Sequence, residues 1–289
     1  IACDECPITS FHVSEACRGC LAHRCSNVCP RRAITIINQK AHIDPDKCVE
    51  CGKCQSVCPY NAIIKSARPC QNACKVSAIS MDENKKAVIS NEKCVSCGAC
   101  VYQCPFGAIM DKSFILEAIK ILRQADSNKN YKVYAVVAPS ISSQYGQKMT
   151  GNIVSGLKQL GFYNVIEAAL GADMVAFKEA HELYKKGFLM SSCCPSFVSY
   201  IKKFFPDMVE HISHNLSPMV EISKYIKKTD PSAKIVFIGP CIAKKAEYRQ
   251  ENVKGIVDCV ITFEELQALF FSRDIDICSL PSDVLDNAS

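Results

Sequence analysis

The stretch CVECGKCQSVCP, residues 48–59, occurs again with the same cysteine spacing as CVSCGACVYQCP, residues 94–105. Each copy has three cysteines separated by two residues and a fourth that directly precedes proline. An Ala-Ile pair follows both copies, at Ala62 and at Ala108. Cysteines at such short, repeated intervals place several thiolates around one loop, so the spacing predicts a duplicated metal-binding unit.

The duplicated pattern resembles that of two-cluster bacterial ferredoxins, in which three thiolates of one motif share a [4Fe–4S] cluster with the last thiolate of the other motif. Buried or disulfide-bonded cysteines are the less favoured interpretation, because disulfide frameworks belong mainly to small extracellular chains. We expect two clusters on this pattern, one bound by Cys48, Cys51, Cys54 and Cys104, and the other by Cys94, Cys97, Cys100 and Cys58.

Looser copies of the motif surround these two. A third cluster is expected from Cys17, Cys20 and Cys25 with either Cys74 or Cys70. A fourth would use Cys3, Cys6, Cys29 and the remaining thiolate, an assignment that rests on counting alone because non-standard spacings do not fix connectivity. The sequence therefore indicates two clusters firmly and a total of three or four.

The cysteines are very unevenly distributed, since 16 of the 21 precede residue 105. The net charge is +5, tryptophan is absent and no basic run occurs, so no nucleic-acid partner is expected. The longest apolar stretches have the length of a strand, and Ile1 begins without an apolar leader, so neither a membrane span nor a signal peptide is expected. Cysteine usage and oxygen-labile clusters favour the cytoplasm of an anaerobe.

The pattern changes after residue 111. We expect a helix over 113–124, strands over 133–138, 164–167, 187–190, 234–239 and 259–261, and helices over 150–160, 171–186, 195–205, 218–228 and 263–271. This alternation predicts an α/β protein with a mainly parallel, doubly wound sheet behind a ferredoxin-like iron–sulfur region. The expected domains are an additional iron–sulfur segment at 1–44, a two-cluster ferredoxin-like domain at 45–111 and an α/β domain at 112–289.

Three loops follow predicted strands, at residues 138–140, 191–195 and 239–245. Ligands of open α/β sheets bind beyond the carboxyl ends of the strands, so these loops are expected to line one site. Cys193 and Cys194 are adjacent and point in different directions, so that one can bind metal while the other faces a substrate. Simple packing of two small cysteines in a core is the alternative.

The segments Ser-Ser-Cys-Cys-Pro at 191–195 and Gly-Pro-Cys-Ile-Ala-Lys-Lys-Ala-Glu at 239–247, behind the ferredoxin-like front end, resemble the [FeFe] hydrogenase family. That family has three signature segments, T-S-C-C-P-x-W, M-P-C-x-x-K-x-x-E and E-x-M-A-C-x-x-G-C. The third does not occur before Ser289, so the resemblance implies a hydrogenase domain that is truncated at its C-terminus.

The resemblance implies a role for each matching residue. Cys194 and Cys241 match two of the four thiolates that bind the [4Fe–4S] half of the H-cluster. Cys193 matches the thiol that passes protons to the bridging amine of the di-iron subsite. Lys244 matches the lysine that hydrogen-bonds a cyanide ligand, a charge-assisted contact.

Further positions match the surroundings of this cofactor. Pro139 and Ser140 match the segment that packs on the other cyanide. Glu179, Glu182 and Ser213 match the outward proton relay, which we expect to run through Glu182, Ser213 and then Glu179. The two glutamates lie three residues apart on a predicted helix and share a face, although without the resemblance they would be read as a solvated surface.

Several positions depart from the family pattern, and they surround the cofactor in the family: Gly239 in place of Met, Met219 in place of Gln, Phe197 in place of Trp and Ser191 in place of Thr. Such changes alter the environment of a metal site and thereby its redox behaviour. They indicate a divergent subgroup, in which hydrogen evolution, oxidation and sensing all stay open.

The resemblance implies reversible reduction of protons to hydrogen, with electrons relayed through [4Fe–4S] clusters from ferredoxin or a similar low-potential carrier. Maturation proteins would supply the di-iron subsite. A hydrogenase-like iron–sulfur assembly protein without catalysis is the alternative, and a hydrogen-sensing hydrogenase is another. Assembly proteins of this type generally have a single cysteine before the proline, whereas this chain has both Cys193 and Cys194 and also retains Lys244.

Overall fold

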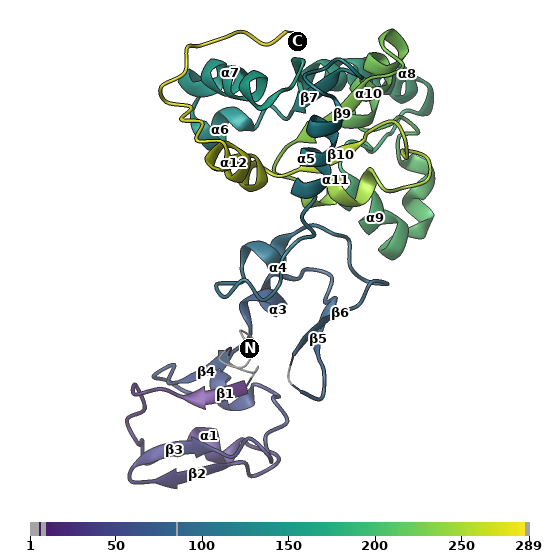
Figure 1. The fold of residues 1–289 in the computed structure, drawn as a ribbon. Coiled ribbons are helices and arrows are strands. Elements are labelled where there is room, and N and C mark those ends of the chain that lie inside the picture. The colour runs from purple at the N-terminus through teal and green to yellow at the C-terminus, as the bar shows by residue number, and fades with distance from the viewer. Residues whose placement is uncertain (1–5, 7–9, 85, 287–289) are drawn as a thin grey trace. The chain divides into compact units, whose positions relative to one another are not determined.

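The computed structural model describes residue 6, residues 10–84 and residues 86–286 of the 289-residue chain. Two compact units make up the chain (Figure 1). One contains residues 1–93 and 99–110 and is called the Cys-rich unit below. The other contains residues 94–98 and 111–289 and is called the sheet unit.

The Cys-rich unit is built from short hairpins and single helical turns. Its antiparallel strand pairs are β1 (Ser10–Val13) with β4 (Ile63–Ser66), β2 (Ile34–Ile37) with β3 (Lys40–Ile43), and β5 (Ile79–Met81) with β6 (Ala87–Ile89). Its helices are α1 (Arg24–Asn27), α2 (Lys53–Ser56), α3 (Pro69–Ala73) and α4 (Ala99–Tyr102).

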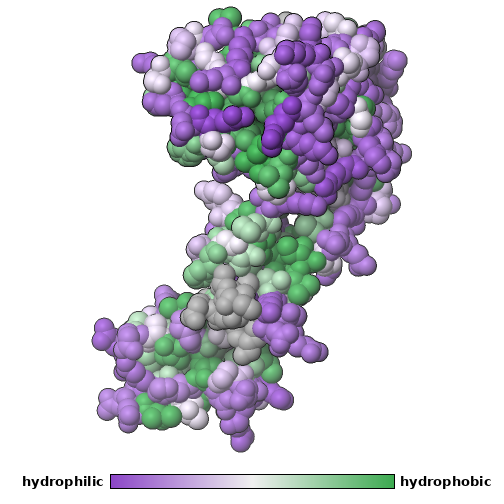
Figure 2. All heavy atoms as spheres, in the orientation of Figure 1, coloured by the Kyte–Doolittle hydropathy of each residue, from purple (hydrophilic) through white to green (hydrophobic). Residues whose placement is uncertain are grey.

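Little apolar surface is buried in this unit. One hydrophobic cluster of its described residues consists of Phe11, Ile34, Ala41, Cys54 and Ile63. Figure 2 shows hydrophobic residues gathered on the surface of the part labelled α3 and α4 in Figure 1. Such a small core is a poor basis for an independent fold, so the unit depends on additional cross-links of its chain.

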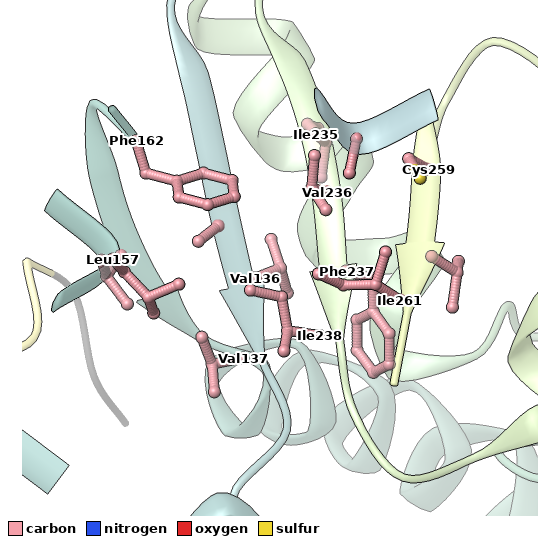
Figure 3. Packing of buried hydrophobic residues seen from close by; sticks show 14 of the residues in the cluster. Val136, Val137, Leu157, Phe162, Ile235, Val236, Phe237, Ile238, Cys259 and Ile261 are labelled. Atoms are coloured by element: carbon pink, nitrogen blue, oxygen red, sulfur yellow. The ribbon is translucent and has the colours of Figure 1, made fainter. Parts of the chain in front are cut away.

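The sheet unit has a parallel sheet in the order β10-β9-β7-β8. The strands are β7 (Val133–Val137), β8 (Asn164–Glu167), β9 (Lys234–Ile238) and β10 (Cys259–Ile261). Figure 3 shows side chains of neighbouring strands, including Val136, Ile238 and Ile261, packed in the core. Continuous buried runs such as Ile235–Ile238 are typical of parallel strands that helices cover on both faces.

The helices of this unit are α5 (Ile115–Gln124), α6 (Ile141–Tyr145), η1 (Gln147–Met149), α7 (Thr150–Leu160), α8 (Ala168–Lys186), α9 (Pro195–Phe204), η2 (Pro206–His211), α10 (Pro218–Thr229), α11 (Ile242–Glu247) and α12 (Phe263–Ser272). α8 packs closely on α10 because Gly171 lacks a side chain. A Cβ there would lie 2.4 Å from the carbonyl oxygen of Pro218. None of the helices in the described residues has both the length and the apolar character needed to cross a membrane.

The expected α/β fold is confirmed, but the strand expected over 187–190 is wrong. There only Met190 forms an isolated parallel bridge, with Ile212, outside the four-stranded sheet. Gly187 ends α8 with a positive φ of 76°, so the chain turns directly after the helix. The loop that carries Cys193 and Cys194 therefore begins from this turn and not from a strand of the sheet.

Candidate functional site

Two of the predicted loops leave the same edge of the sheet. β7 and β9 are parallel neighbours in which Val137 lies opposite Ile238, and the Ala138 N–H donates to the Ile238 oxygen at 2.8 Å. Pro139 and Ser140 follow at once and are exposed. The matching loop after β9 leads to Cys241, the residue that caps the N-terminus of α11.

The third loop joins them through the start of α9. Cys194 caps this helix with φ −106° and ψ 107°, nearly the conformation of Cys241, which has φ −95° and ψ 111°. Cys193 and Cys194 are both exposed. The Lys244 ammonium donates to the Cys193 carbonyl oxygen at 3.2 Å and so connects the loop before α9 with α11.

Lys244 and Glu247 form a buried ion pair beside these cysteines. Each residue is 8% exposed, and Nζ of Lys244 lies 2.8 Å from Oε2 of Glu247. An ammonium group has three N–H donors, and the acceptors among the described residues, Glu247 and the Cys193 carbonyl, use two of them. The third donor is left for a small anionic ligand.

Two polar residues of this site were missed by the expectations from sequence. Glu247 is the last residue of the Gly-Pro-Cys segment and could have been found from that motif. Ser217 carried no signal, yet its Oγ is buried and has no hydrogen-bond partner among the described residues. Ser217 and Glu247 line one cavity with Ser192 and Ser213, so the site holds an orphaned polar atom where a bound group would supply a partner.

The expected relay residues meet the cysteine loop in an order different from the one expected. Glu179, not Glu182, touches that loop, because its Oε1 accepts from Ser191 Oγ at 3.0 Å and from the Ser192 N–H at 3.2 Å. Ser213 Oγ donates to Glu182 Oε2 at 3.0 Å. The geometry therefore puts Glu179 at the inner end and pairs Glu182 with Ser213 farther along α8.

The Glu182 carboxylate is stabilised in its ionised form. Burial raises its pKa, but hydrogen bonds from Lys186, Ser213 and the His214 N–H outweigh burial and lower the pKa below the ordinary value. Lys186 Nζ lies 2.8 Å from Glu182 Oε1. Asn215 also donates to Glu182 at 3.0 Å. A carboxylate with this many donors stays ionised near neutral pH and acts as a hydrogen-bond acceptor for Ser213.

Packing around residue 239 explains why it is glycine and not the Met of the family pattern. A Cβ at this position would lie 2.8 Å from Cε1 of Phe237 and 3.0 Å from the Cβ of Ala138. The space next to the Gly-Pro-Cys segment is therefore filled by Phe237, which belongs to β9. Met219 is 1% exposed and packs in the core, whereas Phe197 is 38% exposed on α9.

In the Cys-rich unit, the same type of turn occurs at each cysteine that ends a motif. The N–H four residues later donates to Sγ of Cys29, Cys58, Cys74 and Cys104 at 3.3, 3.4, 3.1 and 3.2 Å respectively. The residue three positions later has a positive φ, at Arg32, Asn61, Ser77 and Gly107. Backbone N–H groups directed at sulfur favour the thiolate, the form that binds iron.

The thiols gather in groups that differ from those expected. One cavity is lined by Cys29, Cys48, Cys51 and Cys54. A second cavity is lined by Cys6, Cys70 and Cys104. Burial raises the pKa of Cys25, and the nearby thiols Cys20 and Cys58 raise it further, so these form a third group.

These groups contradict the expected exchange between the motifs at 48–59 and 94–105. Cys58, which was expected with Cys94, Cys97 and Cys100, lies with Cys25 because α1 and α2 pack together. Cys29 takes the place that was expected for Cys104 beside the thiols of the 48–59 motif. Cys3 lies outside the described residues, and Cys17, Cys25, Cys29 and Cys58 pack on the cluster around Phe11.

Among the described residues, no three or more Cys, His, Asp or Glu side chains converge on a position for a single metal ion. A cubane has iron at several corners, so its thiolates surround a space and do not meet at one point. The two cysteine-lined cavities have this arrangement. The donor set therefore fits a [4Fe–4S] cluster better than a mononuclear site.

The loop that starts the 94–105 motif belongs to the sheet unit and packs against its cysteine-bearing helices. Lys203 of α9 donates to the Cys94 carbonyl oxygen at 2.7 Å. Gly98 has a φ of 80°, and a Cβ there would lie 2.7 Å from Cδ1 of Ile242, the residue after Cys241. Residues 94–98 are therefore held next to the start of α11.

Comparison with curated proteins finds hydrogenases and assembly factors. The periplasmic [Fe] hydrogenase large subunit of Nitratidesulfovibrio vulgaris is 30% identical over 275 residues, which are 85% of this chain and 61% of the relative. The NADP-reducing hydrogenase subunit HndD of Solidesulfovibrio fructosivorans is 28% identical over 210 residues, 61% of this chain and 35% of the relative. The cytosolic Fe-S cluster assembly factor NAR1 of Kluyveromyces lactis is 36% identical over 94 residues, 32% of this chain and 20% of the relative. The chain thus spans less than two thirds of these relatives.

Solved structures agree on the fold. A variant of the [FeFe]-hydrogenase HydA1 from Chlamydomonas reinhardtii matches with a TM-score of 0.54 and 23% identity, over 61% of this chain and 51% of that one. At this identity the likeness concerns the fold alone.

Two family models match the chain itself. The model described as a 4Fe-4S dicluster domain matches residues 16–62 and 67–108, so the Cys-rich unit is an iron–sulfur region. The model described as the C-terminal domain of the iron-only hydrogenase large subunit matches residues 131–289, more than half of the chain. With the parallel sheet and the cysteine-bearing loops at its edge, this match shows that the chain belongs to the iron-only hydrogenase large-subunit family.

Proposed function

We propose that this chain belongs to an [FeFe] hydrogenase that catalyses the reversible reduction of protons to hydrogen. The observation that carries the proposal is the Lys244 ammonium, which is buried, paired with Glu247 and bonded to the carbonyl of Cys193. This one side chain fixes the loop of the paired cysteines and has a donor left for an anionic ligand. An assembly factor that holds only cubanes has no use for such a donor.

The H-cluster, when bound, would supply the iron chemistry that protein side chains lack. Cys194 and Cys241, each capping a helix in the same extended conformation, would provide thiolates to its cubane half. Lys244 would bind one anionic ligand of the di-iron half, and Pro139 and Ser140 would border another. Cys193, exposed next to Cys194, would carry the proton.

Protons would leave Cys193 along α8. Glu179 accepts from the two serines that precede Cys193, so it is the first carboxylate of the path. Ser213 and Glu182, bonded to each other, form the outer part. This order reverses the one expected from the sequence and follows from the contacts of the two glutamates.

Electrons would come from ferredoxin or a similar low-potential carrier and pass through the [4Fe–4S] clusters of the Cys-rich unit. The loop at Cys94–Gly98 packs on α9 and α11, so the cluster of this motif would be the last donor. The di-iron subsite would come from dedicated maturation proteins.

A second candidate is a non-catalytic iron–sulfur assembly protein. One observation favours it, namely the 36% identity to a cytosolic assembly factor. The two candidates differ in the di-iron subsite and therefore in what infrared spectroscopy detects.

The deciding experiment matures the protein with the di-iron cofactor and records the infrared bands of iron-bound carbon monoxide and cyanide. The hydrogenase proposal expects these bands and expects the cyanide bands to shift in Lys244→Met. Lys227→Met is the matched control, because that lysine pairs with Asp258 away from the cysteine loops. Absence of all bands, with the cubanes intact, would favour the assembly protein.

A further inference from the structure

The Cys-rich unit repeats one local structure more often than its strict motifs indicate. The third cysteine of each motif is the second residue of a short helix, at Cys25 in α1, Cys54 in α2, Cys70 in α3 and Cys100 in α4. The last cysteine follows four residues later, with the same sulfur-directed turn at Cys29, Cys58, Cys74 and Cys104. The Cys70–Cys74 segment is thus the second half of a complete unit.

This segment lacks the Cys-x-x-Cys pair that directly precedes the helix in the other units. Cys6 supplies what is missing, because it lines a cavity with Cys70 and Cys104 although about sixty residues separate it from Cys70 in sequence. Pro69, Pro105 and Ile109 also line this cavity, so its walls are mostly apolar.

The three thiols show the same exchange as the better-spaced motifs. In the first pair of motifs, Cys29 lies with the thiols of the 48–59 motif, while Cys58 lies with Cys25. In the same way Cys104, which ends the 94–105 motif, lies with Cys70. A terminal thiolate that crosses to the partner's cluster is the mark of a two-cluster ferredoxin module.

We propose that Cys6, Cys70 and Cys104 bind a further [4Fe–4S] cluster and that the module containing residues 10–66 is inserted between Cys6 and the rest of this site. Cys3, which stands in a Cys-x-x-Cys spacing with Cys6, lies outside the described residues and is not included in this site. The inserted module closes on itself, because β1 at its start pairs with β4 at its end.

This inference does not rest on the hydrogen reaction, and its readouts are iron content and spectra. The full chain is reconstituted with iron and sulfide, and iron per chain is measured with the electron paramagnetic resonance spectrum of the reduced protein. Cys6→Ala, Cys70→Ala and Cys104→Ala should each remove about four irons or alter one and the same spectral component. Cys48→Ala should alter a different component.

Cys278→Ala is the matched control, since this thiol is exposed in the sheet unit and should change neither readout. Circular dichroism of Cys6→Ala and Cys104→Ala should match that of the wild type, because the remaining clusters still stabilise the fold. The proposal is overturned if Cys6→Ala and Cys70→Ala retain the iron and the spectrum of the wild type. It is equally overturned if Cys104→Ala changes the component that Cys48→Ala changes, because that result restores the exchange expected from the strict motifs.

Discussion

The sheet unit and the Cys-rich unit differ in how much apolar surface each buries. Among the described residues, the core cluster of the sheet unit has 35 buried members, and the cluster around Phe11 in the Cys-rich unit has five. At about 25 cal/mol per Å² of buried apolar surface, the first core can offset the entropy of ordering its chain, whereas the second cannot. Bound iron should therefore contribute more to the stability of the Cys-rich unit than to that of the sheet unit.

Removal of iron should therefore produce the largest difference between the two units. Chelation under reducing conditions is expected to abolish hydrogen-exchange protection in β1 to β6, because metal binding is part of the folding free energy of small sites. Amides of β7 and β9 should retain their protection. Exchange measured by mass spectrometry tests this, and simultaneous loss of protection in both units would contradict it.

Cys193→Ala tests the function that we propose for the sheet unit. Loss of a positioned proton carrier should lower hydrogen evolution by about 10²–10⁴-fold without changing the apparent KM for the electron donor. Iron content and the infrared bands should be those of the wild type. Activity assays with a reduced dye test this, with Cys278→Ala as the control for loss of a thiol. Full activity in the Cys193 variant would remove this residue from the proton path.

Truncation of one core side chain should separate the units by stability. Ile238→Ala in β9, where the side chain is fully buried, should lower the free energy of unfolding by about 2–5 kcal/mol. Val88→Ala in β6, where the residue is 44% exposed, should change it by less than about 0.5 kcal/mol. Chemical denaturation monitored by circular dichroism gives both values, and equal losses would show that the small unit has a core of comparable importance.

The thiols of the two units should also differ in their dependence on pH. Burial raises the pKa of Cys259 to about 12 from an ordinary value of 9.0, whereas N–H groups at residues 106–109 outweigh burial and lower the pKa of Cys104. Above pH 9 the unfolded chain releases the Cys259 proton and the folded chain retains it, so this contribution to stability falls as pH rises from 9 to 12. Denaturation of Cys259→Ala should show a flatter decline over this range, and an unchanged slope would contradict the assignment.

Much of the sheet unit could be predicted because its elements are long and regular. The strand over 133–137 and the helix over 150–160 follow directly from buried apolar runs and a 3.6-residue period. The strand expected at 187–190 failed because a short apolar run after a helix has the same composition whether or not a neighbour pairs with it. Only the tertiary structure shows that Met190 has an isolated partner, Ile212.

The residues of the candidate sites also differ in how far the sequence could predict them. The resemblance to the family's signature segments points to Cys193, Cys241 and Lys244, because these residues lie in short contiguous segments, and their roles stay predictions. Which cysteines share a cavity could not be predicted, because spacing describes each loop and not the neighbour on which it packs. Ser217 was invisible for a related reason, since its unpartnered hydroxyl is defined only by its surroundings.

The nesting of one cysteine module inside another also imposes an order on synthesis. As the chain leaves the ribosome, Cys6 emerges before Cys70 and Cys104, so its cavity can close only after both of these residues have been made. Cys20, Cys25 and Cys58 are complete earlier, so the inserted module can take up iron while Cys6 is still without its partners. During that interval Cys6 has no cluster partner and can be oxidised or bind to the wrong cluster, so early supply of iron and sulfide should raise the yield of correctly loaded protein.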